Sequence, residues 1–147
     1  AGDTANIIPE TATMKVSVRA LSPEVRAEIL KRIPEIATGV AQGLGGSAIA
    51  DHVNGTPVTV SGPEATRFVY QVAKDVFGDE SVHYDTKPLM GSEDFAFMLE
   101  KNPNGAYFFI GNGEDSASVH NPKYDFNDDI LVRGAKLWGA LVEAYLK

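Results

Sequence analysis

The feature that most constrains this fold is a crowd of glycines and prolines shortly before the middle of the chain. These helix-breaking and strand-breaking residues are Gly55, Pro57, Gly62 and Pro63. The hydrophobic pattern also changes there, because strand-like segments flank one long helix before the crowd, whereas helices alternate with extended segments after it. We therefore predict two parts, residues 1–55 and residues 56–147.

The first part is expected to have the order β-β-α-β. Ile7-Ile8 is a short apolar run stopped by Pro9, and residues 14–20 alternate apolar with polar side chains. Because neighbouring side chains of a strand point to opposite faces, this alternation predicts a strand with one buried face, paired in a hairpin. Residues 47–60, which follow the helix, read as extended chain again.

The helix of the first part has well-marked ends in the sequence. Ser22 is a suitable N-cap and Pro23 a suitable first residue, while Gly45-Gly46 stops the pattern. Apolar residues recur every three or four positions between these ends, which predicts one buried face. Pro34 falls inside the helix and is expected to kink it, at a cost of about 3 kcal/mol.

The second part predicts an α/β arrangement, because helices and strands alternate along it. The expected elements are a helix from Pro63 to Gly78, a short strand at 81–85, a helix that starts at Gly91–Asp94 with Ser92 as its cap, a buried strand at 105–111, and a helix at about 128–146 capped by Asn127. The predicted inward residues of the last two helices are Phe95, Met98 and Leu99, then Ile130, Leu131, Ala135, Leu137, Trp138, Leu141, Val142 and Tyr145.

Composition excludes several classes of function. A formal net charge of -7 argues against nucleic acid and anionic membranes as partners, since both require a positive surface. No apolar run approaches the roughly 20 residues that span a bilayer. The chain has no cysteine, so any bound metal must use His, Asp or Glu, and a cytoplasmic location is expected.

Chemistry-bearing side chains gather in one segment, Ser118–Asp128, between the predicted strand at 105–111 and the last helix. Ligands of α/β proteins bind beyond the carboxyl ends of strands, so His120 is a candidate ligand or catalyst. Asp125 and Asp128 are candidates to accept its second N–H. A lone histidine in a loop is equally compatible with a surface role, and one imidazole is not a metal site.

Other candidate residues have ordinary structural explanations as well. Gly91, Ser92 and Glu93 lie at a helix start, where free N–H groups bind anions but where plain capping also explains them. Arg19 lies on the polar side of its predicted strand. His52 and His83 lack ligand spacing, and the structural interpretation is favoured for both.

Four motifs in order resemble the carboxyl-terminal half of the dinuclear-metal amidohydrolases, the aminoacylase and carboxypeptidase family. They are Asn6-Ile7-Ile8-Pro9 with a strand ending in Arg19, Met90-Gly91-Ser92-Glu93-Asp94-Phe95, Tyr107-Phe108-Phe109-Ile110-Gly111, and His120-Asn121-Pro122 with Tyr124-Asp125-Phe126-Asn127-Asp128. The resemblance covers essentially the whole chain. It is closest to the branch of hippurate hydrolase and N-acyl-amino-acid amidohydrolases.

The resemblance implies a role for each motif. Residues 1–55 would be the end of a ferredoxin-like lid that dimerises, and residues 56–147 the end of a metallopeptidase-like catalytic domain. His120 would bind one of two divalent ions, whether zinc, manganese, cobalt or nickel. Asn6 and Arg19 would hold the substrate carboxylate or scissile carbonyl, and the segment of Gly91, Ser92 and Glu93 would line the substrate side.

The family's other metal ligands and its general-base glutamate have no counterpart in these residues. We therefore expect a carboxyl-terminal fragment of a homodimeric, cytoplasmic enzyme that hydrolyses N-acyl amino acids, inactive without the amino-terminal half and with no catalytic residue of its own. The alternative is a non-catalytic dimerisation or ligand-binding module of the same ancestry.

Overall fold

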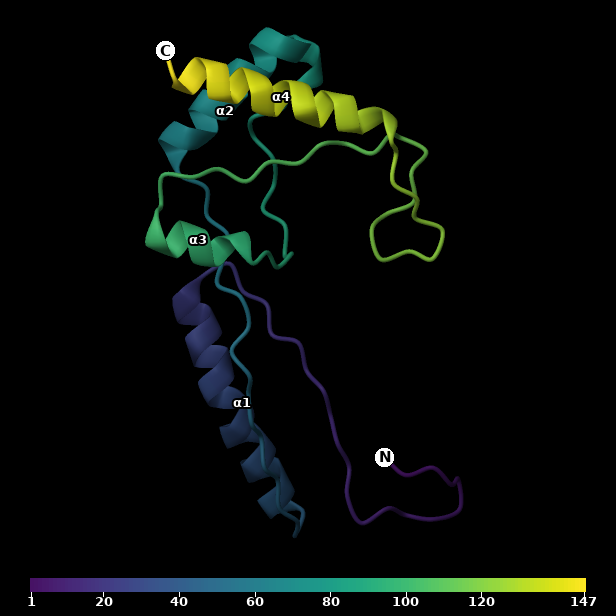
Figure 1. The fold of residues 1–147 in the computed structure, drawn as a ribbon. Coiled ribbons are helices and arrows are strands. Elements are labelled where there is room, and N and C mark those ends of the chain that lie inside the picture. The colour runs from purple at the N-terminus through teal and green to yellow at the C-terminus, as the bar shows by residue number, and fades with distance from the viewer. The chain divides into compact units, whose positions relative to one another are not determined.

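The structure, a computed structural model, describes residues 1–147 and divides them into two compact units, Ala1–Gly55 and Thr56–Lys147 (Figure 1). The division falls at the start of the glycine and proline crowd. The regular elements are four α-helices and one short 3₁₀ helix, and there is no strand. The assignment of the units to a lid and a catalytic portion stays a prediction.

The first unit is built on α1, Pro23–Gly43. The Ser22 side chain accepts a hydrogen bond of 3.2 Å from the backbone N–H of Val25, so the predicted start of this helix is confirmed. An N-cap of this kind stabilises a helix by about 1 kcal/mol. Pro34 lies inside α1 and does not end it.

The predicted β-β-α-β order of the first unit is not confirmed. The segments on either side of α1 are extended but belong to no sheet, and the expected inward residues Met14 and Val16 are 83% and 68% exposed. A period-2 pattern sets which side chains share a face, but a strand also needs a neighbouring backbone to complete its hydrogen bonds. No such ladder forms in the unit.

One apolar side of α1 remains only partly covered. With two side chains from the extended segments it forms an open apolar hollow of about 470 Å³, lined by Met14, Ile33, Ile36, Ala37, Val40, Ala41 and Ala48. None of the residues of α1 is fully buried. The amphipathic pattern therefore produced the helix, but not a closed core within residues 1–55.

The core of the second unit lies between α2, Pro63–Phe77, and α4, Asp129–Tyr145. Its buried residues are Val72, Ala73, Leu137 and Leu141. Helix α2 ends at Gly78, whose φ of 83° suits glycine, so both predicted ends of this helix are confirmed. At the other helix, the N-cap residue is Asp128 rather than the predicted Asn127, although Asn127 Oδ1 accepts from the N–H of Asp129 at 3.1 Å.

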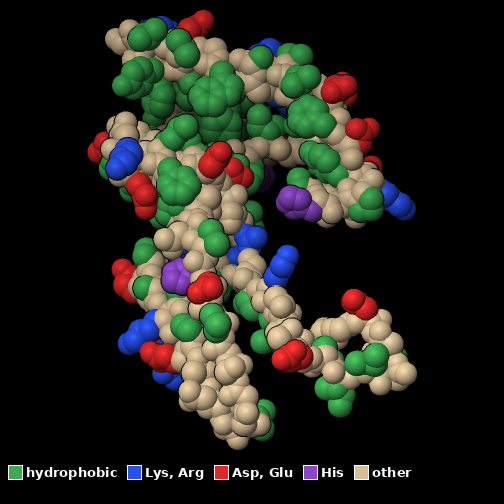
Figure 2. All heavy atoms as spheres, turned by 60° about the horizontal axis from the view of Figure 1, so that its bottom comes forward, with side chains coloured by type: hydrophobic (Ala, Val, Ile, Leu, Met, Phe, Trp, Pro, Cys, Tyr) green, Lys and Arg blue, Asp and Glu red, His purple; other side chains and the backbone are tan.

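The predicted inward face of α4 is only partly confirmed. Leu137 and Leu141 are buried, whereas Leu131, Trp138 and Val142 are more than half exposed. Only one helix packs on α4, so only a narrow stripe is covered. Figure 2 shows hydrophobic side chains open to solvent on the face in view.

Two strands predicted for the second unit are also absent. A short 3₁₀ helix, η1 at Asp79–Ser81, and a loop replace the strand at 81–85. Residues 105–111 are extended and bond to the residues before α2 through two contacts, Gly62 N–H to the Gly105 carbonyl at 2.8 Å and Tyr107 N–H to Ser61 Oγ at 2.9 Å. These two contacts are not continued as a ladder of backbone hydrogen bonds, so residues 105–111 form no strand.

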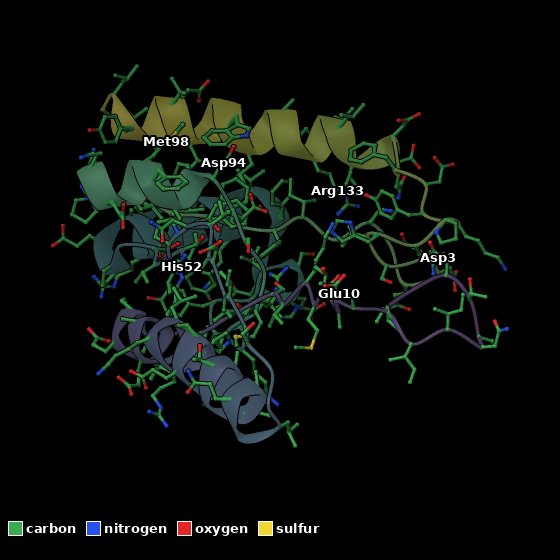
Figure 3. The ribbon with its side chains drawn as sticks, turned by 90° about the horizontal axis from the view of Figure 1, so that it is seen from below. Asp3, Glu10, His52, Asp94, Met98 and Arg133 are labelled. Carbon is green, nitrogen blue, oxygen red and sulfur yellow. The ribbon has the colours of Figure 1, made fainter.

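Helix α3, Phe95–Lys101, begins later than the sequence predicts, with Asp94 rather than Ser92 as its N-cap. Its buried residues are Ala96 and Leu99, and Met98, labelled in Figure 3, is 66% exposed, so the prediction of an inward Met98 was wrong. None of the helices has the length and apolar character needed to cross a membrane.

Candidate metal-ligand loop

The candidate histidine lies on a loop, residues 113–126, that two asparagines close at its base. The N–H of Asn127 donates to Asn112 Oδ1 at 2.8 Å, and Asn127 Nδ2 donates to the Asn112 carbonyl at 3.2 Å. Asn112 Nδ2 also donates to the Asp125 carbonyl at 2.8 Å. We call residues 113–126 the His120 loop and this asparagine pair the clamp.

Two consecutive turns shape the tip of the His120 loop. Asn121 N–H donates to the Ser118 carbonyl at 3.2 Å, and Tyr124 N–H donates to the Asn121 carbonyl at 2.9 Å. His120 occupies the third position of the first turn with a φ of 65°, the sole positive φ among the non-glycine residues. This left-handed conformation costs roughly 1–2 kcal/mol for a residue with a Cβ. It persists where the surrounding structure enforces it.

The imidazole of His120 is exposed and forms no hydrogen bond, so it is open to a ligand. The sequence suggested that Asp125 or Asp128 accepts its N–H, but neither carboxylate does so. No three His, Asp or Glu side chains gather anywhere in the chain. Because a protein-bound zinc ion takes three or four protein ligands, these residues fit one ligand position of a metal centre and not a complete centre.

A second polar group lies beside α3, where Glu93 meets Tyr107. Burial raises the pKa of the Tyr107 hydroxyl, and the hydrogen-bonded carboxylate of Glu93 raises it further. The Tyr107 ring also contacts Phe95 and Phe109, with ring centroids 6.1 and 5.2 Å away. A neutral phenol is thus held against a carboxylate in a largely aromatic setting. Gly91 and Ser92 are exposed in the segment that leads to this group.

The remaining candidates lie elsewhere. Asn6 and Arg19 are exposed residues of the first unit, whereas His120 and Glu93 belong to the second. His52, labelled in Figure 3, and His83 are both exposed in extended or loop segments and join no ligand group. Neither unit by itself brings all the predicted site residues together.

Sequence reasoning missed two polar residues that shape these sites, Asn112 and Tyr107. The position of Asn112 offered one signal, because an asparagine between Gly111 and Gly113 is typical of a turn. Tyr107 offered none, since an aromatic residue in an apolar run reads as core. Its carboxylate partner is visible only once the chain has folded.

Comparison with known proteins gives this geometry its context. Residues 8–144 match the model of peptidase family M20/M25/M40, and the chain belongs to that family. Membership implies an α/β peptidase fold, of which the structure of this chain contains helices and no strands. The resemblance to amidohydrolases that the sequence motifs indicated is confirmed.

The chain is 41% identical over 150 residues to the hippurate hydrolase of Campylobacter jejuni. The aligned region covers all of this chain and 38% of the hydrolase. The chain is 31% identical over 153 residues to the IAA-amino acid hydrolase ILR1-like 4 of Arabidopsis thaliana, covering 99% of the chain and 34% of the relative. The chain is 30% identical over 135 residues to thermostable carboxypeptidase 2 of Saccharolobus solfataricus, and the aligned region covers 88% of the chain and 33% of the carboxypeptidase. The chain therefore spans about a third of the length of these relatives. No solved structure matches the chain.

Proposed function

We propose that this chain forms part of a metal-dependent amidohydrolase that cleaves the amide bond of N-acyl amino acids, and that His120 supplies one of its metal ligands. The observation that carries the proposal is an exposed imidazole, held at a φ of 65° on a clamped loop, in a chain 41% identical to a hippurate hydrolase. Two other relatives are named as an IAA-amino acid hydrolase and a carboxypeptidase, and both names denote hydrolysis at an amino-acid residue.

The roles of the chain's own residues follow from their chemistry. His120 would hold a divalent ion through a neutral ring nitrogen, which its exposure leaves accessible. When bound, the two ions of such a site supply an activated water and polarise the scissile carbonyl. Glu93 and the segment before α3 would line the substrate side, and Asn6 and Arg19 would bind the carboxylate or carbonyl of the substrate, in the manner that the family resemblance implies.

The 147 residues by themselves are proposed to be inactive. One imidazole supplies a single donor, and no cluster of three ligating side chains accompanies it. We propose that the complete polypeptide supplies the other ligands and the general base, acts as a homodimer and resides in the cytoplasm. A non-catalytic module remains the alternative, and it differs in one measurable property, since it would turn over no substrate even as the complete polypeptide.

The decisive experiment compares His120→Ala with His83→Ala in the complete polypeptide that contains this chain. Both histidines are exposed, but His83 lies in a loop far from the clamp in sequence. Turnover of a panel of N-acyl amino acids and metal content per polypeptide are measured after chelation and reloading with zinc, manganese, cobalt or nickel. We expect His120→Ala to lose at least 100-fold in turnover and to bind less metal, and His83→Ala to do neither. Normal turnover and metal content in His120→Ala would exclude the ligand assignment.

A further inference from the structure

The side chain of Asn112 ties together the two arms of the His120 loop. Its amide nitrogen donates to Ser116 Oγ at 2.6 Å, on the arm before His120, and to the Asp125 carbonyl at 2.8 Å, on the arm after it. Its amide oxygen accepts from the N–H of Asn127 at 2.8 Å. Both amide hydrogens and the carbonyl oxygen are therefore used, and every partner belongs to the loop or its base.

These hydrogen bonds restrict the position of His120, because they hold the loop on both sides of it. His120 follows Ser116 by four residues and precedes Asp125 by five, so the Asn112 contacts bracket it on both sides. Closing a loop costs conformational entropy, and a left-handed residue at its tip adds backbone strain. Contacts elsewhere must offset both of these free-energy costs. The turn bonds at Ser118 and Asn121 shape the tip, but only the clamp joins the two arms.

We propose that Asn112 is a positioning residue: it touches no ligand, and it holds the His120 imidazole where a metal ion can use it. This inference rests on the proposed function, because it supposes that His120 is a ligand. It adds a residue that lies eight positions before His120, outside the His120-Asn121-Pro122 segment. Removing a residue that hydrogen-bonds directly to a metal ligand typically changes metal affinity by about 10–100-fold, and because Asn112 acts through the loop backbone we expect an effect at the lower end of that range.

A graded series of variants tests the proposal in the complete, metal-loaded polypeptide. Asn112→Ala removes all three bonds. Asn112→Asp keeps an oxygen for the Asn127 N–H and can accept from the Ser116 hydroxyl, but it sets a carboxylate against the Asp125 carbonyl. Asn102→Ala is the matched control, because this exposed asparagine also accepts one backbone N–H, from Asn104 at 3.1 Å, away from the loop.

Metal affinity is measured by competition with a chromophoric chelator, and thermal unfolding is followed in parallel. We expect Asn112→Ala to weaken the affinity at least tenfold, Asn112→Asp to fall between it and the parent, and Asn102→Ala to stay within twofold. As a readout without metal, the three-bond coupling between the amide and α protons of His120 reports its φ. It should change in Asn112→Ala of the 147-residue chain.

The outcomes separate this inference from the proposed function. If His120→Ala loses metal while Asn112→Ala keeps the parent's affinity, the positioning role is overturned and the ligand assignment stands. If His120→Ala keeps its metal, both are overturned. If Asn112→Ala does not fold, Asn112→Asp decides, since parental affinity together with an unchanged His120 coupling in that variant would overturn the proposal.

Discussion

Leu137 on α4 offers the sharpest test of the packing in the second unit. Only six residues of the chain are buried hydrophobics, and Leu137 is among them with 5% exposure. It belongs to the cluster in which Val72 and Ala73 of α2 face α4. Leu131, on the same helix, is 59% exposed and provides a control of identical chemistry.

The expected magnitudes follow from these exposures. Full burial of a leucine side chain stabilises by about 1.5–3 kcal/mol, and a cavity left in the core adds to the loss, so Leu137→Ala should cost about 3 kcal/mol. Leu131 loses less than half of its surface on folding, and its neighbours need not collapse around a cavity. Leu131→Ala should therefore cost about 0.5 kcal/mol.

Urea unfolding of the 147-residue chain, followed by tryptophan fluorescence, measures both values. Trp138 is the single tryptophan, it lies on α4, and its ring centroid is 5.6 Å from that of Phe108. With a urea dependence of about 1.5 kcal/mol per molar, the difference of about 2.5 kcal/mol between the variants corresponds to a separation of about 1.7 M between their midpoints. Equal midpoints for the two variants would refute the assignment of the α2 and α4 contact as the core.

Two further predictions concern backbone and ionisation. A Cβ at Gly62 would clash with the Pro103 carbonyl oxygen, so Gly62→Ala should lower the unfolding free energy by about 1–3 kcal/mol, and a stabilised Gly62→Ala would contradict this close approach. Gly139→Ala, with open space around its Cβ, should raise the unfolding free energy by about 0.5–1 kcal/mol. Burial and then Glu93 raise the pKa of Tyr107, so the unfolded chain loses this proton first and stability should fall as the pH rises above about 10. Urea midpoints at pH 9 and 11 should show a smaller fall in Tyr107→Phe, and an identical fall would count against the buried phenol.

Features that depend on neighbours in sequence could be predicted well. Ser22 caps α1 and Gly78 ends α2 as expected, because the atoms that satisfy a helix end lie within about one turn of it. Asn127 was predicted to cap α4; its side chain does accept from Asp129 N–H, but the N-cap residue of α4 is Asp128. The loop of His120 was also predicted from local residue types, although its role as a ligand awaits the variant comparison.

The failures share a different cause. The alternation at 14–20 and the apolar run at 105–111 predicted strands, but a strand requires a second backbone, and the structure gives neither segment a ladder partner. Met98 and Trp138 were expected inside and are exposed, because an apolar stripe becomes buried only where another element covers it. Periodicity therefore predicted which residues share a face of a helix or extended segment, but it did not predict which of these faces another element would cover.

Residues close together along the chain sufficed to predict the start of α1, both ends of α2, the family that the chain resembles and the candidate histidine, although α3 begins later than predicted. The tertiary structure alone decided that α2 packs on α4, that Tyr107 meets Glu93, and that Asn112 closes the loop of His120 through partners up to fifteen residues away. The physical reason is that caps and turns are satisfied locally, whereas burial and clamping depend on contacts that exist only after the chain has folded back on itself.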